Sequence, residues 1–170
     1  MELKLSPWEL ADEESALMAN QIMQLDGHSG FLLFWEDEMD WSDWVQRNND
    51  SALGINVFPG FVPGIQMKAT LDGKLVGRVS IRFSLNERLW LDGGHIGYYL
   101  LPRHRGQGLG KEVLRQSLQI AKANNLAKVL IICAESNLPS RGVAESQGGV
   151  LERVEALADG ERVARYWIEI

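Results

Sequence analysis

Hydrophobic and polar residues alternate with a period of two along two stretches of the chain, and this alternation predicts β-hairpins. In the first, "IQMKATL" and "KLVGRVSIRFSL" flank Asp72-Gly73, a dipeptide typical of tight hairpin turns. In the second, residues 149–157 and 162–170 flank Asp159-Gly160 near the end of the chain. We therefore expect antiparallel strands on both sides of the middle region.

The middle region changes to helical spacing and then to a continuous apolar run. One face of a predicted helix carries the apolar residues Leu109, Val113, Leu114, Leu118 and Ala121. The next stretch, "AKVLIICA", is apolar almost throughout, as in a strand buried on both faces of a parallel sheet. The stretch "NLPSRGVAESQGG" predicts a short helix that begins near Asn137 or Ser140.

The N-terminal third has weaker patterns. It predicts a short strand, a helix with Leu10, Leu17, Ile22 and Leu25 as its apolar residues, and a second helical segment within residues 36–50. A turn-rich loop follows at residues 54–65. We find no repeat or domain boundary, so the expected fold is a mixed α/β single domain over residues 1–170, with antiparallel hairpins around one β-α-β-α unit.

Composition narrows the function classes. The chain has 170 residues, 45% of them hydrophobic, and a net charge of −6 with scattered basic residues, which disfavours nucleic acid as a partner. We expect a soluble, cytoplasmic protein with no membrane contact, because no stretch approaches the roughly 20 apolar residues of a membrane span. No metal site is expected. The single cysteine, Cys133, lies in the apolar run and is predicted to be an inert core thiol.

Three glycines in five positions, Gly106, Gly108 and Gly110, stand between an apolar strand and the predicted helix in "YYLLPRHRGQGLGKEVL". A dinucleotide-binding fingerprint fails because Lys111 occupies the place of its third glycine. A phosphate-loop motif fails because Glu112 follows Gly110-Lys111 where Ser or Thr is required. A glycine-rich turn that opens a helix still presents several backbone amides at the positive end of the helix, which suits a pyrophosphate. The alternative is that the glycines only make a tight turn.

The stretch "LLPRHRGQGLGKEVL" resembles the acyl-CoA signature of the GNAT superfamily of N-acetyltransferases, Arg/Gln-x-x-Gly-x-Gly/Ala, through Arg105, Gly108 and Gly110. The later "NLPS" is similar to the Asn-x-x-Ser/Ala that opens the next helix in that superfamily. The resemblance covers residues 65–155, and the N-terminal third agrees only in layout. It implies a twisted mixed sheet whose two central parallel strands splay apart, flanked by helices.

The resemblance also implies acetyl-CoA as co-substrate. Its pantothenyl arm would pair with backbone groups of Tyr99, Leu100 and Leu101, and its pyrophosphate would bind the amides of the glycine turn. The residues expected to bind it are Tyr99, Leu100, Leu101, Arg103, Arg105, Gly106, Gln107, Gly108, Leu109, Gly110, Lys111, Asn137 and Ser140. Asn137 has an alternative interpretation as a helix cap.

Direct acetyl transfer needs a base for the amine and a proton for the leaving thiolate. His95 lies four residues before Tyr99 on the same face of the strand and is the predicted base, with Asp92 and Glu87 as alternates through water. The other interpretation is that His95 only hydrogen-bonds the preceding loop. Relatives place a tyrosine acid where this chain has Ala144, so Tyr98, Tyr99 and Tyr166 are the substitutes.

We expect the acceptor to be a primary amine of a small molecule or peptide. The segment "FWEDEMDWSDW" sets five carboxylates among Trp35, Trp41 and Trp44, a composition that attracts organic cations, although an ordinary solvated helix has the same pattern. The function predicted is an acetyl-CoA-dependent N-acetyltransferase. The alternative is a catalytically weak acyl-CoA-binding regulatory or sensor domain, suggested by Ala144. Self-association as a homodimer stays open.

Overall fold

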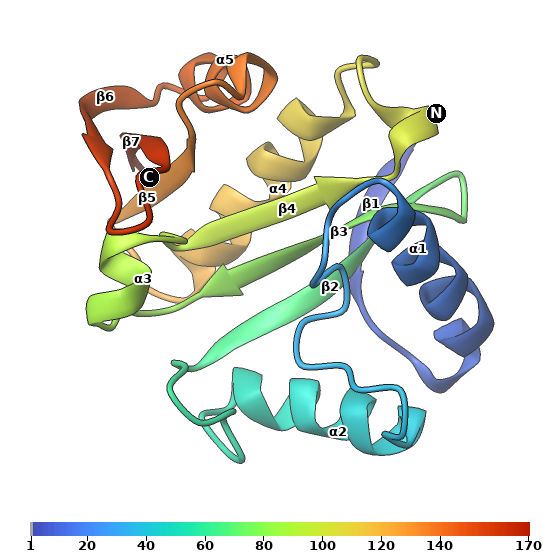
Figure 1. The fold of residues 1–170 in the computed structure, drawn as a ribbon. Coiled ribbons are helices and arrows are strands. Elements are labelled where there is room, and N and C mark those ends of the chain that lie inside the picture. The colour runs from blue at the N-terminus through green and yellow to red at the C-terminus, as the bar shows by residue number, and fades with distance from the viewer. Residues whose placement is uncertain (1) are drawn as a thin grey trace.

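Two β-sheets lie next to each other and are covered by helices on both sides (Figure 1). The computed structural model describes residues 2–170. The first sheet has the order β1-β2-β3-β4, with β1 at Leu3–Pro7, β2 at Gly64–Leu71, β3 at Lys74–Arg82 and β4 at Ile96–Leu100. The second has the order β5-β7-β6, with β5 at Lys128–Ala134, β6 at Val150–Ala156 and β7 at Arg162–Glu169. Neighbouring strands within each sheet are antiparallel.

The helices surround the two sheets. They are α1 at Glu13–Leu25, α2 at Trp41–Ala52, α3 at Glu87–Leu91, α4 at Leu109–Ala123 and α5 at Leu138–Ser146, with 3-10 turns η1 at Leu10–Asp12 and η2 at Pro102–His104. Figure 1 shows α1 and α2 on the near side and α4 behind the strands. Within residues 2–170, no helix has the length and apolar character needed to cross a membrane.

Both predicted hairpins are confirmed. Asp72 and Gly73 join β2 to β3 with φ angles of 48° and 79°. A two-residue hairpin turn needs such left-handed conformations to match the twist of the flanking strands. The strands β6 and β7 pair around Asp159-Gly160. β7 lies between β5 and β6, so the end of the chain forms the centre of the second sheet.

The predicted splay of the central strands is also confirmed. β4 and β5 touch at their beginnings, where the His95 amide donates to the Leu130 carbonyl at 2.8 Å. Just before β4, Gly94 forms an isolated antiparallel bridge with Ile131. Beyond this bridge, Tyr98 of β4 lies close to Cys133 of β5, so the two strands then run in the same direction. No ladder of hydrogen bonds joins them, however, and the two sheets are separate. A gap therefore opens between β4 and β5.

Two hydrophobic clusters lie on the two faces of β4. Side chains of Tyr98 and Leu100 pack against the cluster that contains Val113 and Leu114 of α4. Tyr99 and Leu101 pack against the other cluster, which contains α1, α2 and four tryptophans, Trp8, Trp35, Trp41 and Trp44. Because successive side chains of a strand point to opposite faces, β4 contributes to both sides of the gap.

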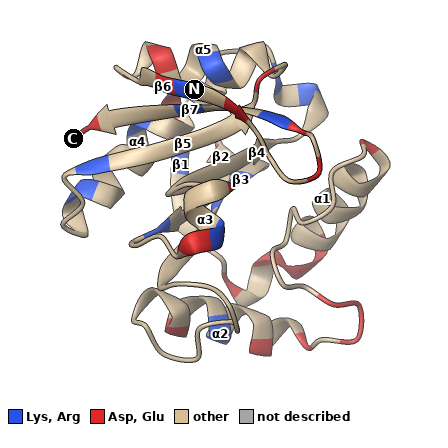
Figure 2. Cartoon of the chain, turned by 60° about the vertical axis from the view of Figure 1, so that its left-hand side comes forward, with Lys and Arg blue, Asp and Glu red and all other residues tan. Residues whose placement is uncertain are grey.

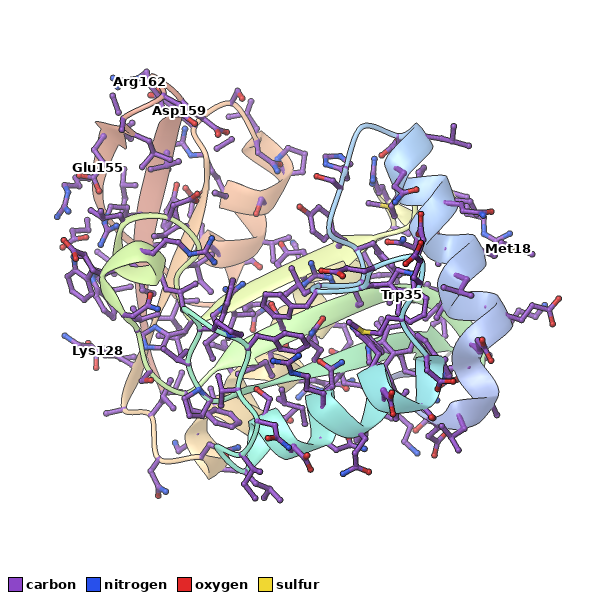
Figure 3. All side chains as sticks on the ribbon, turned by 60° about the horizontal axis from the view of Figure 1, so that its bottom comes forward. Met18, Trp35, Lys128, Glu155, Asp159 and Arg162 are labelled. Carbon is purple, nitrogen blue, oxygen red and sulfur yellow. The ribbon has the colours of Figure 1, made fainter. Side chains whose placement is uncertain are left out.

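The structure corrects the predicted apolar face of α1. The buried residues of this helix are Ala16, Ala19, Asn20 and Met23. Of the residues predicted for the apolar face, Leu17 packs against the second cluster, whereas Leu10, Ile22 and Leu25 are exposed. Met18 is 57% exposed and Leu25 is 91% exposed. Figure 3 shows Met18 on the side of α1 away from the strands and Trp35 between α1 and the sheet. The helix starts at Glu13, and Ser6 and Pro7 belong to β1.

Candidate active site

The glycine turn opens α4 without a side-chain cap. Gly106 and Gly108 have φ angles of 73° and 77°, and Gly108 is the N-cap residue of the helix. These left-handed angles are the reason for glycine at both positions. No side chain accepts from the first-turn amides, which leaves donors at the positive end of a helix dipole. The turn therefore has the chemistry of an anion site.

A cavity of about 550 Å³, here called the cradle cavity, lies against this turn and the gap beside β4. Its lining brings together most of the residues predicted to bind the co-substrate, the predicted catalytic residue Tyr98, and three residues that were not predicted, His28, Pro139 and Val143. The lining residues are His28, Tyr98, Tyr99, Leu100, Arg105, Gly106, Gly108, Leu109, Gly110, Lys111, Asn137, Pro139, Ser140 and Val143. Three predicted residues, Leu101, Arg103 and Gln107, do not line it.

The backbone of Leu101 is committed to the fold, which corrects its predicted role. Its amide donates to the Val76 carbonyl at 2.9 Å, and its carbonyl accepts from the His104 amide at 2.8 Å. By strand alternation, Tyr99 pairs with β3 in the same way as Leu101, and Tyr98 and Leu100 turn their backbone groups toward the gap. Leu100 is thus the predicted backbone partner best placed for a ligand in the gap.

Arg105 ties the glycine turn to the end of α1. Its Nη2 lies 2.6 Å from the Asp26 carboxylate, and its Nε donates to the Leu100 carbonyl at 3.1 Å. The guanidinium therefore holds the turn in place, while the backbone of the turn faces the cavity. Gln107 has a similar supporting role, because its side-chain amide donates to the Arg103 carbonyl at 2.9 Å.

His28 is a site residue that the sequence did not reveal. It follows α1 in a loop, its ring centroid lies 5.4 Å from that of Tyr99, and its Nε2 lies 3.6 Å from the Asp26 carboxylate. No motif surrounds it, and its place in the cavity depends on how the loop folds back over the sheet. It is a titratable group at the mouth of the gap.

Tyr98 crosses the cradle cavity between α4 and α5. A Cβ atom at Gly110 would lie 3.5 Å from the Tyr98 ring and 3.3 Å from Val143, so glycine at 110 leaves room for this ring. Burial raises the pKa of the Tyr98 hydroxyl, with a smaller opposing effect of the hydrogen bond from Ser140. The hydroxyl therefore keeps its proton at neutral pH.

Asn137 caps α5, as the alternative interpretation held. Its Oδ1 accepts from the Ser140 amide at 3.1 Å. Both residues also line the cradle cavity, so the cap lies at the site. Ala144 is fully buried in α5 and brings no hydroxyl to this region.

The position of His95 does not fit the role of a base. Its Nδ1 accepts from the Leu130 amide at 2.9 Å, where it joins the starts of β4 and β5, and its side chain is buried outside the cradle cavity. Burial, with the nearby charge of Arg82, lowers the pKa of His95 to about 4. An imidazole whose free lone pair is already occupied is unavailable to take a proton. His95 is a hydrogen-bonding residue, as the other interpretation held, but its partner is Leu130 of β5 rather than the preceding loop.

Three of the alternate bases and acids, Asp92, Glu87 and Tyr166, also lie elsewhere. Asp92 is exposed at the end of α3, and Glu87 is exposed in the first turn of the same helix. The Tyr166 hydroxyl accepts from Arg141 at 2.9 Å and donates to Glu145 at 2.7 Å, in a buried position under α5. None of the three lines the cradle cavity.

Cys133 is half-buried on β5. Burial raises the pKa of its thiol, so the thiolate that a nucleophilic cysteine requires is disfavoured. Within residues 2–170, no group of three or more His, Cys, Asp or Glu side chains is arranged to hold a metal ion.

The acidic segment before and within α2 does not reach the cavity. Trp35, Trp41 and Trp44 pack on one another, with Trp41 and Trp44 stacked at 4.8 Å between ring centroids. The five carboxylates are exposed, at Glu36, Asp37, Glu38, Asp40 and Asp43. Asp40 serves as the N-cap of α2 and accepts from the Ser42 amide at 2.8 Å. Figure 2 shows acidic residues on the loop between α1 and α2, at the outer edge of the molecule. The predicted geometry, with indole faces and carboxylates around a ligand, is not found here.

Comparison with known proteins identifies the family. A model described as an acetyltransferase (GNAT) domain matches residues 2–150, which is most of the chain. The protein therefore belongs to the GNAT acetyltransferase family, and the resemblance noted in the sequence is confirmed. A search of curated proteins found no match.

Solved structures with the same fold cover nearly the whole chain. One is the acetyltransferase from Salmonella typhimurium that modifies the N-terminal serine of ribosomal protein L7/L12, with a TM-score of 0.69 and 20% identity, covering 99% of this chain and 95% of that one. Another is the microcin C7 self-immunity acetyltransferase MccE in complex with acetyl-CoA and AMP, with a TM-score of 0.67 and 20% identity, covering 99% and 93%. A GNAT-family acetyltransferase from Streptococcus pneumoniae has a TM-score of 0.67 and 18% identity, covering 99% and 100%. At these identities the likeness shows the fold.

Proposed function

We propose that the protein is an N-acetyltransferase that moves an acetyl group from acetyl-CoA to a primary amine. The observation that carries the proposal is the cradle cavity, in which an uncapped helix start with two left-handed glycines adjoins the gap between β4 and β5. The amides of the glycine turn suit the diphosphate of acetyl-CoA, and the gap suits its narrow arm. Lys111, which lines the cavity, adds a positive charge.

When bound, acetyl-CoA supplies the acetyl group as an activated thioester. The Leu100 amide, which faces the gap, is the donor available to a carbonyl oxygen there. The Tyr98 hydroxyl holds its proton at neutral pH and is the proposed proton donor. His28, at the mouth of the gap and beside Asp26, replaces His95 as the proposed base for the amine.

The second candidate function is a CoA-binding sensor without turnover. It rests on Ala144, which is fully buried and stands where relatives place a tyrosine acid. A sensor keeps the cradle cavity and lacks the proton donor. The two functions differ in a single measurable property, the release of free thiol in the presence of an amine.

The test combines binding with turnover. CoA should raise the melting temperature, and release of free thiol from acetyl-CoA should depend on an added amine from a panel. Tyr98→Phe should lower kcat about tenfold or more and leave the CoA-induced shift intact. A CoA shift without turnover on any amine would favour the sensor. Absence of the shift would rule out the cradle for either function.

A further inference from the structure

A second cavity of about 300 Å³, here called the arginine cavity, adjoins the cradle cavity. Both are lined by Tyr98, Tyr99, Asn137 and Ser140, so they meet at the gap between β4 and β5. The arginine cavity extends from there to the loop after α1 and to two cationic side chains of β3, Arg78 and Arg82. An acceptor that approaches the gap from the side opposite α4 would lie in it.

Arg78 is buried with a donor left over. Arg78 is only 3% exposed, and its Nε has no hydrogen-bond partner within residues 2–170. The other two nitrogens donate to the Gly30 carbonyl at 2.6 Å and to the Ser80 hydroxyl at 3.3 Å, and the guanidinium lies 4.8 Å from the centre of the Tyr99 ring. A guanidinium has five N–H groups, and each one that is buried without an acceptor has an unfavourable desolvation free energy.

Arg82 lies on the same face of β3, four residues further on. Its Nη1 donates to the carbonyls of Gly93 and Gly94, each at 3.1 Å. A Cβ atom at Gly97 would lie 3.7 Å from Nη1 and 3.8 Å from Nη2, so the guanidinium extends over β4 at Gly97. All of these partners are neutral.

Within residues 2–170, neither arginine has a carboxylate at ion-pairing distance, in contrast to two buried cations elsewhere in this protein. Arg165 is 0% exposed and lies 3.0 Å from Glu152 and 3.3 Å from Glu155. Lys68 lies 2.9 Å from Glu9 and 2.6 Å from Asp12. Within residues 2–170, no carboxylate approaches Arg78 or Arg82 to 4.0 Å.

Arg78 is buried and Arg82 is half-buried. Two such positive charges without an ion-paired carboxylate are unfavourable in the free protein, although the charge of Asp92 opposes part of the lowering of the Arg82 pKa. Burial lowers the pKa of Arg78 to about 9 and that of Arg82 to about 10. At neutral pH both groups are still charged, so a negative ligand group would relieve the cost of their burial. Arginine forks bind carboxylates and phosphates through paired hydrogen bonds.

We propose that the acceptor of this protein carries an oxyanion, a carboxylate or a phosphate, which binds Arg78 and Arg82 in the arginine cavity while its amine faces the gap. The proposal rests on the proposed acetyl transfer and names the substrate class for that site. It reverses the charge expected from the acidic segment of the sequence. A small anionic amine fits the size of the cavity.

The test compares matched amines that differ in charge. We would measure kcat and KM for glycine against glycinamide and for O-phosphoethanolamine against ethanolamine, with rates expressed per free-base amine. The anionic member of at least one pair should have about tenfold or higher kcat/KM, mainly through a lower KM, because the contact is made in binding. The two pairs distinguish a carboxylate from a phosphate.

Arg82→Gln and Arg78→Gln should each reduce this preference below about threefold while the CoA-induced melting shift is unchanged. Arg82→Gln decides the matter if Arg78→Gln fails to fold. Arg47→Gln is the matched control. Arg47 also stacks on an aromatic ring, that of Phe58 at 3.8 Å, and donates to a loop carbonyl, that of Asn56 at 3.2 Å, but it does not line the arginine cavity. Its loss should leave the preference intact.

A binding measurement separates failure of this proposal from failure of the proposed reaction. Inorganic phosphate or N-acetylglycine should bind saturably to the CoA-loaded protein and lose that binding in Arg82→Gln. Such binding without turnover on any amine would keep the anion site and reject the acetyltransferase. No preference for anionic amines together with no arginine-dependent anion binding would overturn the inference, as would a preference that survives both arginine substitutions.

Discussion

His95 shows how a single buried side chain can hold two sheets together. Its Nδ1 accepts from the Leu130 amide, so the proton of the neutral imidazole is on Nε2. The pKa of about 4 in the folded protein lies below the unperturbed value of about 6.5. The unfolded chain therefore binds a proton between these values that the folded chain does not. This contribution to stability is present above pH 6.5 and is lost as pH falls toward 4.

The two histidines should respond differently to substitution. His95→Asn keeps an acceptor for the Leu130 amide and should retain kcat within about threefold, with less loss of melting temperature between pH 6.5 and 4 than the native protein shows.

His28→Gln should lower kcat about tenfold or more with an unchanged melting temperature. The measurements are steady-state kinetics and thermal melts over pH. The opposite pattern, with kcat lost only in His95→Asn, would restore His95 as the base.

At the scale of elements, the start of α4 can be tested without straining the backbone. Gly108 has φ of 77°, so a branched residue such as valine would be strained whether or not a ligand binds. Asparagine tolerates this conformation and adds a side chain where the structure shows open space. Gly108→Asn should therefore remove most of the melting shift caused by CoA, a shift that corresponds to about 2.7 kcal/mol at 100 times Kd.

The matched control is Gly60→Asn, because Gly60 has the same φ of 77° and equally open space but lies far from the cradle in the chain. It should keep the full CoA shift. If Gly108→Asn also keeps it, the glycine turn has no part in binding CoA.

The elements that the sequence predicted well are those whose partners are close in the chain. The hairpins, α4 and the apolar strand β5 follow from alternation, helical spacing and two Asp-Gly turns. The prediction for α1 was wrong for Leu10, Ile22 and Leu25, because the buried face also uses small and polar residues. Asn20, for example, accepts from the Leu32 amide at 3.2 Å and so holds the loop that folds back over the helix. The hydrophobic pattern of the helix itself does not reveal this contact with a loop further along the chain.

The residues of the candidate site likewise fall into those that the sequence predicts and those that it does not. The glycine turn and the Asn137 cap are visible in the sequence because each depends on neighbours in the chain. His28 and the two arginines are not visible there. The place of His28 depends on how its loop folds back, and the role of Arg78 and Arg82 depends on the absence of a carboxylate within 4.0 Å among residues 2–170. Arg78 and Arg165 have similar strand contexts, and only the folded structure shows that one of them lacks a carboxylate.

At the scale of the whole molecule, the net charge of −6 gives little information about the site. Replacing Glu36, Asp37 and Glu38 by their amides removes three negative charges from an exposed loop. Long-range effects are screened beyond about 8–10 Å at physiological salt, so the ratio of kcat/KM between putrescine and glycine should change less than about twofold. Kinetics at two salt concentrations checks this. A marked loss of activity on putrescine alone would show that this acidic segment selects the charge of the acceptor.

The loop from Asp26 to Gly30 forms part of the wall of both cavities. Asp26 is held by Arg105 of the glycine turn, His28 lines the cradle cavity, and the Gly30 carbonyl accepts from Arg78. When one ligand binds in its cavity and orders this loop, the second ligand finds the loop already ordered in the other cavity. The conformational entropy of the loop is then lost only once. For the two ligands proposed here, thermodynamic reciprocity then applies: CoA must change the affinity for the anionic acceptor by the same factor by which the acceptor changes the affinity for CoA. Substrate addition would thus be cooperative although neither ligand needs to touch the other.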